Sequence, residues 1–360
     1  MAPRPYWELR GATSFLVHLN LVMQPSKLTV NMISESTFTV QGHGVHTAFQ
    51  EMTDALAARP DIDVKVNKFR RRADITHIQT FGPYSLLHLW FGSGKKVISV
   101  HVVPDSLVGS IVGAKRFYWF AKWYMKHFYG RADLLLSVSK MVDDTLREQL
   151  GIHKPSRVLY NTVDMRVYQS SPGDKSKART ALALPADAQV VVSCAQIQPR
   201  KRFDIFCEAA KAMPDARFIW IGGIPFKHLG ADYGLMQKML DEKPANVTVT
   251  GVIDHDDVRR YLQAADVFFL PSDQENHPMA VLEAAGAGLP IVVRDIPEYD
   301  DTFKNDVVRG TDDTFIELIK KLASDEAFRA KAIAGSKDIA KRFDSHAGGE
   351  QLVEAYKSIL

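Results

Sequence analysis

Short apolar runs alternate with longer amphipathic segments along most of the chain, starting at Leu28. The runs at 28–33, 96–101, 190–195 and 266–270 have the length and continuous hydrophobicity of strands buried on both faces of a parallel sheet. The segments between them carry good helix formers, with apolar residues at helical spacing. Because the alternation restarts in the second half, the pattern predicts an α/β protein with two doubly wound parallel sheets facing a cleft.

The two halves are separated by residues 166–188, which are polar and irregular and include Ser170-Ser-Pro-Gly-Asp174. Segments of this composition commonly connect domains. We therefore predict a first domain at 28–165, a linker at 166–188, a second domain at 189–340 and a closing helix at 341–360.

The first 27 residues do not fit the alternating pattern. The apolar stretch 15–23 resembles the hydrophobic part of a signal peptide, but His18 and Asn20 interrupt it and no small-residue cleavage site follows. We interpret residues 1–27 as an N-terminal extension, with Met23 as an alternative initiator. A helix lying on a surface is the other interpretation.

Composition excludes several classes of protein. The chain has 360 residues and a formal net charge of +3, which is too small to indicate nucleic acid as a partner. Its two cysteines, Cys194 and Cys207, form no disulfide framework and no metal-ligand spacing, and they fit a reducing compartment. No apolar run approaches the roughly 20 residues that span a bilayer.

Two glutamates mark the strongest candidate site. Glu275-Asn-His-Pro-Met-Ala-Val-Leu-Glu283 follows the apolar run at 266–270, and a helix is expected to begin near Met279. Glu275 would then lie at the carboxyl end of a strand, where open α/β sheets bind ligands. The start of the helix can hold an anion. This arrangement favours a ligand that carries both hydroxyls and phosphate.

A basic loop, Gln196-Ile-Gln-Pro-Arg-Lys-Arg202, follows the apolar run at 190–195. A run of like charges is usually a solvated surface. This one is expected at the same sheet edge as Glu275, and arginine and lysine bind phosphate oxygens well. We therefore favour a phosphate-binding role.

Weaker signals lie elsewhere. His101 is expected at the carboxyl edge of a strand, and Gly42-His43-Gly44 opens a predicted helix at 45–58. Asp254-His-Asp256 could be a pair of metal-binding carboxylates, but Asp254 with Asp257 fits a helix N-cap and its partner better. Nothing else suggests a metal, so we expect neither metal nor cofactor.

The segment 111–131 combines eight aromatic residues with five cations and no acid. Phe117, Phe120, Tyr124 and Phe128 share one predicted helical face. The segment could be a core-packed helix with a solvated basic side, or an interfacial helix whose cations meet anionic lipid. Stacking on nucleic acid is a third use, although no nucleic-acid-binding motif accompanies it. The cations are Lys115, Arg116, Lys122, Lys126 and Arg131.

These motifs together resemble retaining GT-B glycosyltransferases of family four. The resemblance covers nearly all of the chain from Leu28 and rests on the basic loop followed by Phe203, Gly222-Gly223, Thr250-Gly251 and Pro271-Ser-x2-Glu275-x7-Glu283. Within the family, the chain is most similar to bacterial diacylglycerol α-glucosyltransferases. That similarity includes Gln41-Gly-His-Gly-Val45, the stretch 100–110 and the aromatic basic helix after it. Two departures are Ala195, where glycine is usual, and Gln196, where many members have arginine.

The resemblance implies two Rossmann-like domains, a C-terminal helix that crosses back to the first domain, and a set of site roles. Lys201 and Arg200 would bind the donor diphosphate and stabilise the charge that develops as it leaves. Glu275 and His101 would contact the donor sugar. Glu283 would hold the ribose hydroxyls. The remaining donor-binding positions would be Gly44, Gln196, Gly251, Val252 and the backbone of Asn276, His277, Pro278, Met279 and Ala280.

The function implied by the resemblance is transfer of a hexose, most simply glucose from UDP-glucose, to a lipid hydroxyl such as that of diacylglycerol. The enzyme would retain the α configuration, need no metal, and lie peripherally on the cytoplasmic face of an anionic cell membrane. Acceptor and membrane contacts would come from Asp105, Lys115, Arg116, Trp119, Lys122, Trp123 and Lys126. The alternatives are another acceptor (phosphatidylinositol, a polyprenyl-linked sugar or a soluble glycan) and a protein that only binds a nucleotide sugar. An epimerase would bring further acid/base residues, which the sequence does not contain.

Overall fold

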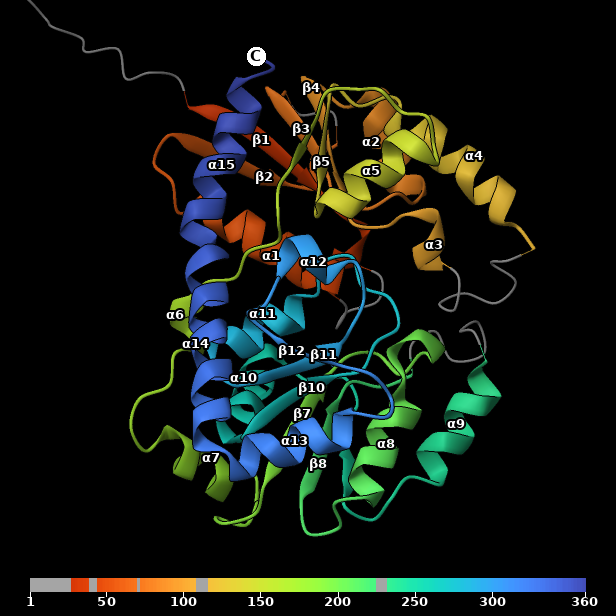
Figure 1. The fold of residues 1–360 in the computed structure, drawn as a ribbon. Coiled ribbons are helices and arrows are strands. Elements are labelled where there is room, and N and C mark those ends of the chain that lie inside the picture. Colours follow the sequence, from red (N-terminus) through yellow and green to blue (C-terminus); the bar gives the residue numbers. More distant parts are fainter. Residues whose placement is uncertain (1–26, 39–43, 70–71, 108–115, 225–231) are drawn as a thin grey trace, which may run out of the picture.

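A computed structural model describes residues 27–38, 44–69, 72–107, 116–224 and 232–360, and it contains two six-stranded parallel sheets, one above the other (Figure 1). The first sheet has the strand order β2-β1-β3-β4-β5-β6. Its strands are β1 (Leu28–Ile33), β2 (Ile62–Val66), β3 (Ile75–Ile78), β4 (Lys95–Val100), β5 (Leu134–Ser137) and β6 (Ser156–Val158).

The second sheet has the order β12-β11-β10-β7-β8-β9, which is the doubly wound order of dinucleotide-binding folds. Its strands are β7 (Val190–Cys194), β8 (Arg217–Ile221), β9 (Val247–Val249), β10 (Val267–Leu270), β11 (Ile291–Arg294) and β12 (Val308–Gly310). The prediction of two doubly wound parallel sheets is therefore confirmed. The winding direction reverses between β7 and β10, which are hydrogen-bonded neighbours. Ligands bind in the crevice at such a reversal.

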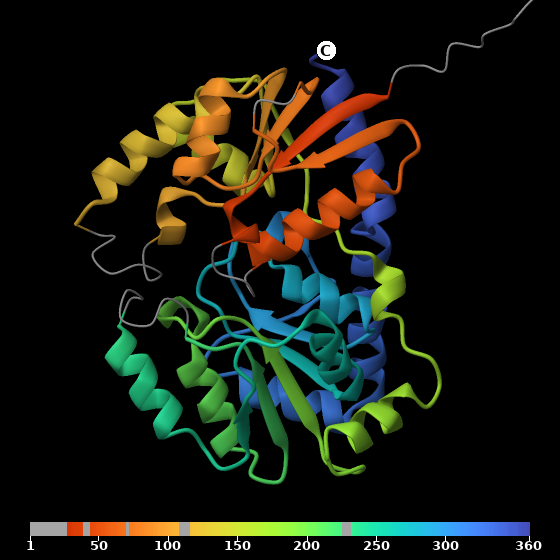
Figure 2. The ribbon, with the colours of Figure 1, turned by 180° about the vertical axis from the view of Figure 1, so that it is seen from behind.

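Fifteen α-helices connect and cover the strands in the described parts of the chain, and Figure 2 shows them from behind. The first half has α1 (Gly44–Ala57), α2 (Pro83–Phe91), α3 (Pro104–Leu107), α4 (Tyr118–Tyr129), α5 (Lys140–Glu148), α6 (Met165–Tyr168) and α7 (Asp174–Ala181). The second half has α8 (Phe203–Lys211), α9 (Tyr233–Asp241), α10 (His255–Ala264), α11 (Met279–Gly286), α12 (Tyr299–Thr302), α13 (Phe315–Ser324), α14 (Glu326–Arg342) and α15 (Ser345–Lys357).

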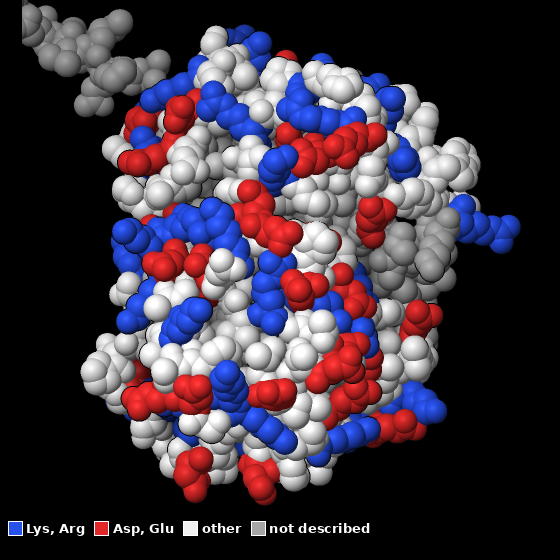
Figure 3. All heavy atoms as spheres, in the orientation of Figure 1, with Lys and Arg blue, Asp and Glu red and all other residues white. Residues whose placement is uncertain are grey.

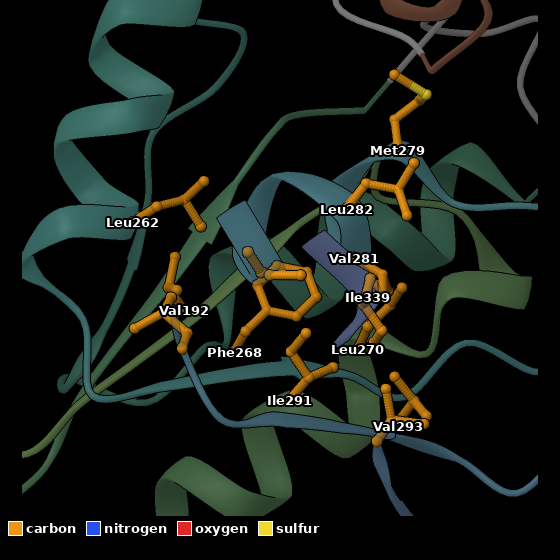
Figure 4. Packing of buried hydrophobic residues seen from close by; sticks show 14 of the residues in the cluster. Val192, Leu262, Phe268, Leu270, Met279, Val281, Leu282, Ile291, Val293 and Ile339 are labelled. Carbon is orange, nitrogen blue, oxygen red and sulfur yellow. The ribbon is translucent and has the colours of Figure 1, made fainter. Parts of the chain in front are cut away.

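Strand β10 shows why the apolar runs carry no alternation. Phe268 and Leu270 point into one core, where they meet Val281 and Ile291 (Figure 4). Phe269 points to the opposite face and packs in a second core. Because helices cover both faces of the sheet, every position of the strand is buried.

The C-terminal helix crosses back to the first sheet, as predicted. Helix α14 packs beside α11 of the second half, whereas α15 lies along α1 of the first half (Figures 1 and 2). Leu352 and Tyr356 of α15 are buried in one core with Val30 and Met32 of β1. The end of the chain therefore contributes to the first domain's core.

The predicted linker contains a packed helix. Helix α7 lies against α10, and the buried Arg179 donates hydrogen bonds to the Ala264 carbonyl at 3.0 Å and to Asp266 at 2.7 Å. We retain the division into 28–165, 166–188, 189–340 and 341–360 as a proposal. The proposed extension at 1–27 lies outside the described residues, except for Lys27.

Some local features differ from the sequence predictions. The edge strand β2 and helix α2 were not predicted. Asp254 occupies the N-cap position of α10, but its side chain makes no capping hydrogen bond. The bond there joins the Asp257 amide to the Asp254 carbonyl, so the backbone alone forms this helix start.

Gly222 provides a test of the packing between the ends of β7 and β8. Its φ is +129°, and a Cβ atom would lie 2.1 Å from the Ala195 carbonyl oxygen. We expect Gly222→Ala to lower the free energy of unfolding by about 2 kcal/mol or more. Gly234→Ala, on α9 with no atom within 4 Å of the added carbon, is the matched control. Urea unfolding curves that move equally little for both variants would contradict this account.

Candidate active site

Two loops meet at the reversal point of the second sheet. The basic loop leaves β7, and the loop with Glu275 leaves the adjacent β10. The Asp273 amide donates a hydrogen bond to the Arg200 carbonyl at 2.8 Å, and the Arg200 guanidinium donates to the Gln274 carbonyl at 3.0 Å. These bonds fix the two loops relative to each other.

The centre of the site is a buried ion pair between Lys201 and Glu275. The Lys201 Nζ donates a short, charge-assisted hydrogen bond to Glu275 Oε1, and Arg200 Nη1 lies 4.0 Å from Oε2. Burial alone would raise the pKa of Glu275, but the charges of Lys201 and Arg200 outweigh it and hold the pKa below its usual range. Burial lowers the pKa of Lys201 to about 8, although Glu275 opposes the shift. Both side chains are therefore charged at neutral pH.

Arg202 does not join this pair, although the sequence placed it in the same basic run. Its backbone is left-handed, with φ +54°. Its side chain forms ion pairs with Asp204, Asp273 and Asp312 at 2.9–3.2 Å. The site therefore contains two of the three successive cations.

Glu283 lies in a different environment from Glu275. It is buried inside α11, and burial together with the Glu51 carboxylate raises its pKa to about 7, although a hydrogen bond with Tyr168 opposes the shift. Glu51 comes from α1 of the first half, and its pKa is also raised to about 7, mainly by burial. Its carboxylate accepts a hydrogen bond from the Asp164 amide at 2.8 Å. The two acids of the motif are thus chemically distinct.

The first domain supplies the opposite wall. His101 follows β4, is buried, and bonds through Nε2 to Gln79 Oε1 at 2.7 Å. The Asn276 side chain reaches across and donates to the His101 carbonyl at 2.7 Å and to Ser106 Oγ at 3.0 Å. His101 and Asn276 therefore lie side by side where the two halves meet.

The other donor-site predictions are placed as follows. A Cβ atom on Gly44 would lie 3.8 Å from Met279 Cγ, so the starts of α1 and α11 face each other. Pro278 is the N-cap of α11 and provides no side-chain capping bond, and Ala280 lies in the first turn.

Gln196 is half-buried and accepts a hydrogen bond from Gln198 at 3.3 Å. Gly251 has φ +71° and pairs with Gly222 at the sheet edge, and Val252 beside it is exposed.

The His277 side chain points away from this site. Its ring is buried against Tyr160, Phe303 and Phe343, and burial lowers its pKa to about 3. Its carbonyl accepts a hydrogen bond from Asn161 Nδ2 at 2.9 Å. Only the backbone of His277 can contribute to ligand binding.

Helix α4 protrudes from the first domain (Figure 1). Phe128 is buried and Tyr124 half-buried, but Phe117 is 59% exposed and Phe120 48% exposed. The predicted face is therefore packed into the core only in its second half, because the first half of the helix extends beyond the core. Trp119 and Trp123 are exposed as well, at 70% and 52%. Lys115 lies outside the described residues.

Basic and aromatic side chains gather on and beside α4. Arg116, Lys122 and Lys126 lie on or next to the helix, and blue spheres mark its free end in Figure 3. Helix α2 adds exposed Trp90 and Phe91, with the Arg131 guanidinium 5.9 Å from the Trp90 ring. None of the helices in the described ranges is long and apolar enough to cross a membrane.

Asp105 lies on α3 beside this helix. It accepts a hydrogen bond from the Tyr118 hydroxyl at 2.5 Å and another from Gln149 at 3.3 Å. Burial and this carboxylate raise the pKa of Tyr118 to about 12. Asp105 therefore connects three surface helices.

Comparison with known proteins places this site in a family. A model described as Glycosyltransferase Family 4 matches residues 35–167, and one described as Glycosyl transferases group 1 matches residues 174–338. The α-galactosylglucosyldiacylglycerol synthase of Streptococcus pneumoniae is 32% identical over 285 residues, which cover 78% of this chain and 75% of that protein. The chain belongs to glycosyltransferase family 4.

Two further comparisons concern the family and the fold. The processive diacylglycerol α-glucosyltransferase of Acholeplasma laidlawii is 27% identical over 240 residues, covering 66% of this chain and 71% of that protein. The structure of Anabaena HepE in complex with UDP-glucose superposes with a TM-score of 0.75 and 18% identity, over 92% of this chain and 99% of that one. The latter likeness establishes the GT-B fold of this glycosyltransferase.

Sequence reasoning missed Glu51, Tyr168 and Gln79. Glu51 lies two helical turns after Gly44 on α1, so its spacing could have placed it near the same cleft. Tyr168 and Gln79 carried no comparable signal. The contact of Tyr168 with Glu283 depends on how the two halves pack, whereas Gln79 bonds to His77 and His101 within the first half.

The raised pKa of Glu283 predicts a pH effect on stability. The folded protein holds a proton on Glu283 up to about pH 7, whereas an unfolded glutamate releases it near pH 4.5. The folded state therefore binds more protons in this window, and wild-type stability falls as pH rises through it. Glu283→Gln removes this titration. The free energy of unfolding of the variant minus that of the wild type should therefore be about 1–3 kcal/mol larger at pH 8 than at pH 5.

Urea unfolding at the two pH values measures this difference. Glu350→Gln, an exposed position on α15, is the control and should run parallel to wild type. If the stability of Glu283→Gln also changes with pH in parallel with the wild type, the pKa of Glu283 is not raised in the folded protein.

Proposed function

We propose that this family 4 glycosyltransferase transfers glucose from UDP-glucose to the hydroxyl of diacylglycerol or a closely related lipid at an anionic membrane surface, with retention of the α configuration and without a metal. The observation that carries the proposal is the buried Lys201–Glu275 pair, with Arg200 beside it, at the reversal point of the second sheet. The similarity of the chain to an α-galactosylglucosyldiacylglycerol synthase and to a diacylglycerol α-glucosyltransferase supports the acceptor class.

The donor diphosphate would enter between the starts of α1 and α11, where backbone N–H groups and helix dipoles favour an anion. Its oxygens would compete with Glu275 for the Lys201 ammonium. Glu275 would then accept hydrogen bonds from the sugar hydroxyls, while Lys201 and Arg200 neutralise the phosphate. The ion pair between Lys201 and Glu275 would thus be exchanged for two contacts with the donor.

In the transfer, the bond between the anomeric carbon and the diphosphate oxygen breaks and a bond to the acceptor oxygen forms. The acceptor proton passes to the leaving phosphate, since neither acid of the motif is suited to take it. The two cations beside Glu275 lower its pKa, and Glu283 would bind the ribose. Lys201 and Arg200 would stabilise the negative charge that grows on the leaving group. Among the described residues, no cluster of His, Cys, Asp and Glu is arranged to hold a metal ion.

The surface of α4 and α2 would place the enzyme at the cytoplasmic face of the membrane. Exposed tryptophans suit the headgroup level of a bilayer, and the cations around them suit anionic lipid. Trp119 and Trp123 of α4 and Trp90 of α2 would form this contact. Lys115, Arg116, Lys122 and Lys126 would supply the charge. A lipid acceptor could then enter the cleft without leaving the membrane.

Separate roles for the two acids predict a kinetic split. Glu283→Gln should raise the donor KM about tenfold and leave kcat within about threefold, because ribose contacts act in the ground state and the transition state alike. Glu275→Gln should lower kcat by about 100-fold with a smaller change in KM. Steady-state kinetics with UDP-glucose measures both, with Lys211→Ala on the exposed side of α8 as control. The reverse pattern would mean that the roles are exchanged.

The membrane contact predicts a loss of vesicle binding in Trp119→Ala/Trp123→Ala. Flotation with vesicles of phosphatidylglycerol and phosphatidylcholine should show the wild type in the lipid fraction. The double variant should bind roughly tenfold more weakly, because each indole loses its interfacial contact. Leu235→Ala, a similarly exposed apolar position on α9, should bind as the wild type does. Failure of the wild type to float would remove the membrane from the proposal.

A further inference from the structure

A continuous chain of hydrogen bonds runs through the first domain from helix α15 to His101. Tyr356 Oη lies 2.6 Å from His77 Nδ1, and His77 Nε2 lies 2.8 Å from Ser99 Oγ and 3.1 Å from Gln79 Nε2. Gln79 Oε1 then lies 2.7 Å from His101 Nε2. The side chains of all five residues are at least nine-tenths buried.

The hydrogen atoms of this chain can be assigned from donor and acceptor chemistry. Gln79 Nε2 is 3.0 Å from the Met52 sulfur, which can only accept, so the amide nitrogen faces Met52 and His77. Its oxygen therefore faces His101. A carbonyl oxygen cannot donate, so His101 must donate through Nε2.

The hydrogen atoms at the other end of the hydrogen-bond chain, on His77 and Tyr356, are assigned in the same way. His77 Nε2 accepts from Gln79 and from the Ser99 hydroxyl, so the proton of the neutral ring is on Nδ1 and is donated to the Tyr356 oxygen. The Tyr356 hydroxyl points to the Met32 sulfur, 3.9 Å away. Burial, with His101 adding to the effect, lowers the pKa of His77 to about 3, so the ring is neutral as this arrangement requires.

We propose that Gln79 is a positioning residue that, through this chain, holds His101 in the tautomer protonated on Nε2. The other ring nitrogen, Nδ1, is then the hydrogen-bond acceptor. This inference rests on the proposed function, in which His101 contacts the donor sugar: an acceptor nitrogen can receive a sugar hydroxyl, whereas the opposite tautomer would present a donor there.

The chain also gives the crossover helix a role beyond packing. Tyr356 lies on α15, which comes after the whole second domain in sequence but is buried in the first. Its oxygen accepts the proton on His77 Nδ1, while His77 Nε2 accepts from the Gln79 amide, so Tyr356 is the far end of the hydrogen-bond chain that reaches His101. The C-terminal helix thereby contributes to the geometry at His101, next to the interdomain bond from Asn276.

Histidine tautomers are read directly from long-range proton–nitrogen correlation spectra of the full-length, ligand-free protein labelled with nitrogen-15 in its histidines. The His101 signals are assigned by their loss in His101→Asn. We expect wild-type His101 to show a protonated Nε2 and an unprotonated Nδ1. In Gln79→Met, a substantial share should move to the opposite tautomer. A wild-type His101 protonated on Nδ1, or an unchanged pattern in Gln79→Met, would overturn the proposal.

Tyr356→Phe tests the same chain of hydrogen bonds with a smaller change in structure. It provides the test if Gln79→Met does not fold. It removes the acceptor of His77 and should shift part of His77 toward protonation on Nε2. Tyr84→Phe, which removes a tyrosine hydroxyl bonded to the Asn67 carbonyl elsewhere in the first domain, should leave both histidines unchanged. An unchanged His77 in Tyr356→Phe would overturn the proposed direction of the hydrogen bonds.

Kinetics separates positioning from a purely structural role. Gln79→Met should lower kcat with UDP-glucose about tenfold or more, with a Tm close to wild type and a smaller change in the donor KM. A kcat equal to wild type would overturn the link to the reaction. Because the spectra are recorded without ligand, the tautomers that they report do not depend on which sugar or acceptor the enzyme uses. Failure of the proposed function would appear as a lack of turnover in the wild type.

Discussion

The buried pair of Lys201 and Glu275 is the interaction on which the site depends. Removing two charges from water is costly, and the cost is offset only because the partners touch and Arg200 lies beside them. The contact exists because β7 and β10 are neighbours at the point where the sheet reverses, so loops far apart in sequence leave the same edge. An anion that binds the Lys201 ammonium leaves the Glu275 carboxylate without its main partner, unless the same ligand also carries hydroxyl groups that donate hydrogen bonds to this carboxylate. A nucleotide sugar supplies both.

Around this pair, the two halves of the molecule are connected by polar contacts. Asn276 donates to the backbone beside His101, and Asn161 donates to the His277 carbonyl. Glu51 approaches Glu283 from the first domain, and its carboxylate adds to burial in raising the pKa of Glu283. The crossover helix α15 fixes the first domain's core and, through Tyr356 and His77, reaches the same wall of the cleft. The proposed donor site and the contact between the two halves therefore involve the same few residues.

Much of this arrangement could be predicted from sequence. The apolar runs identified the central strands, and strand ends placed Lys201 and Glu275 at one edge, because carboxyl ends of parallel strands lie together. The separation of Arg202 from Arg200 and Lys201 could not be predicted, since its left-handed backbone and three carboxylate partners come from tertiary structure. The exposure of Phe117 could not be read from periodicity, which does not show where a helix leaves the core. The spacing of Glu51 from Gly44 could have placed it near the cleft, but its approach to Glu283 depends on the packing of α1 against α11, which the pattern of one chain does not contain.

The most direct test of the account is product analysis. The wild-type protein is incubated with labelled UDP-glucose, and in parallel with other UDP- and GDP-sugars, in anionic liposomes that contain diacylglycerol. We expect an α-linked glucosyl diacylglycerol formed from UDP-glucose, and no product from a folded Lys201→Ala variant. Absence of a labelled lipid with every donor, or lipid glycosylation that persists at the wild-type rate in Lys201→Ala, would contradict it.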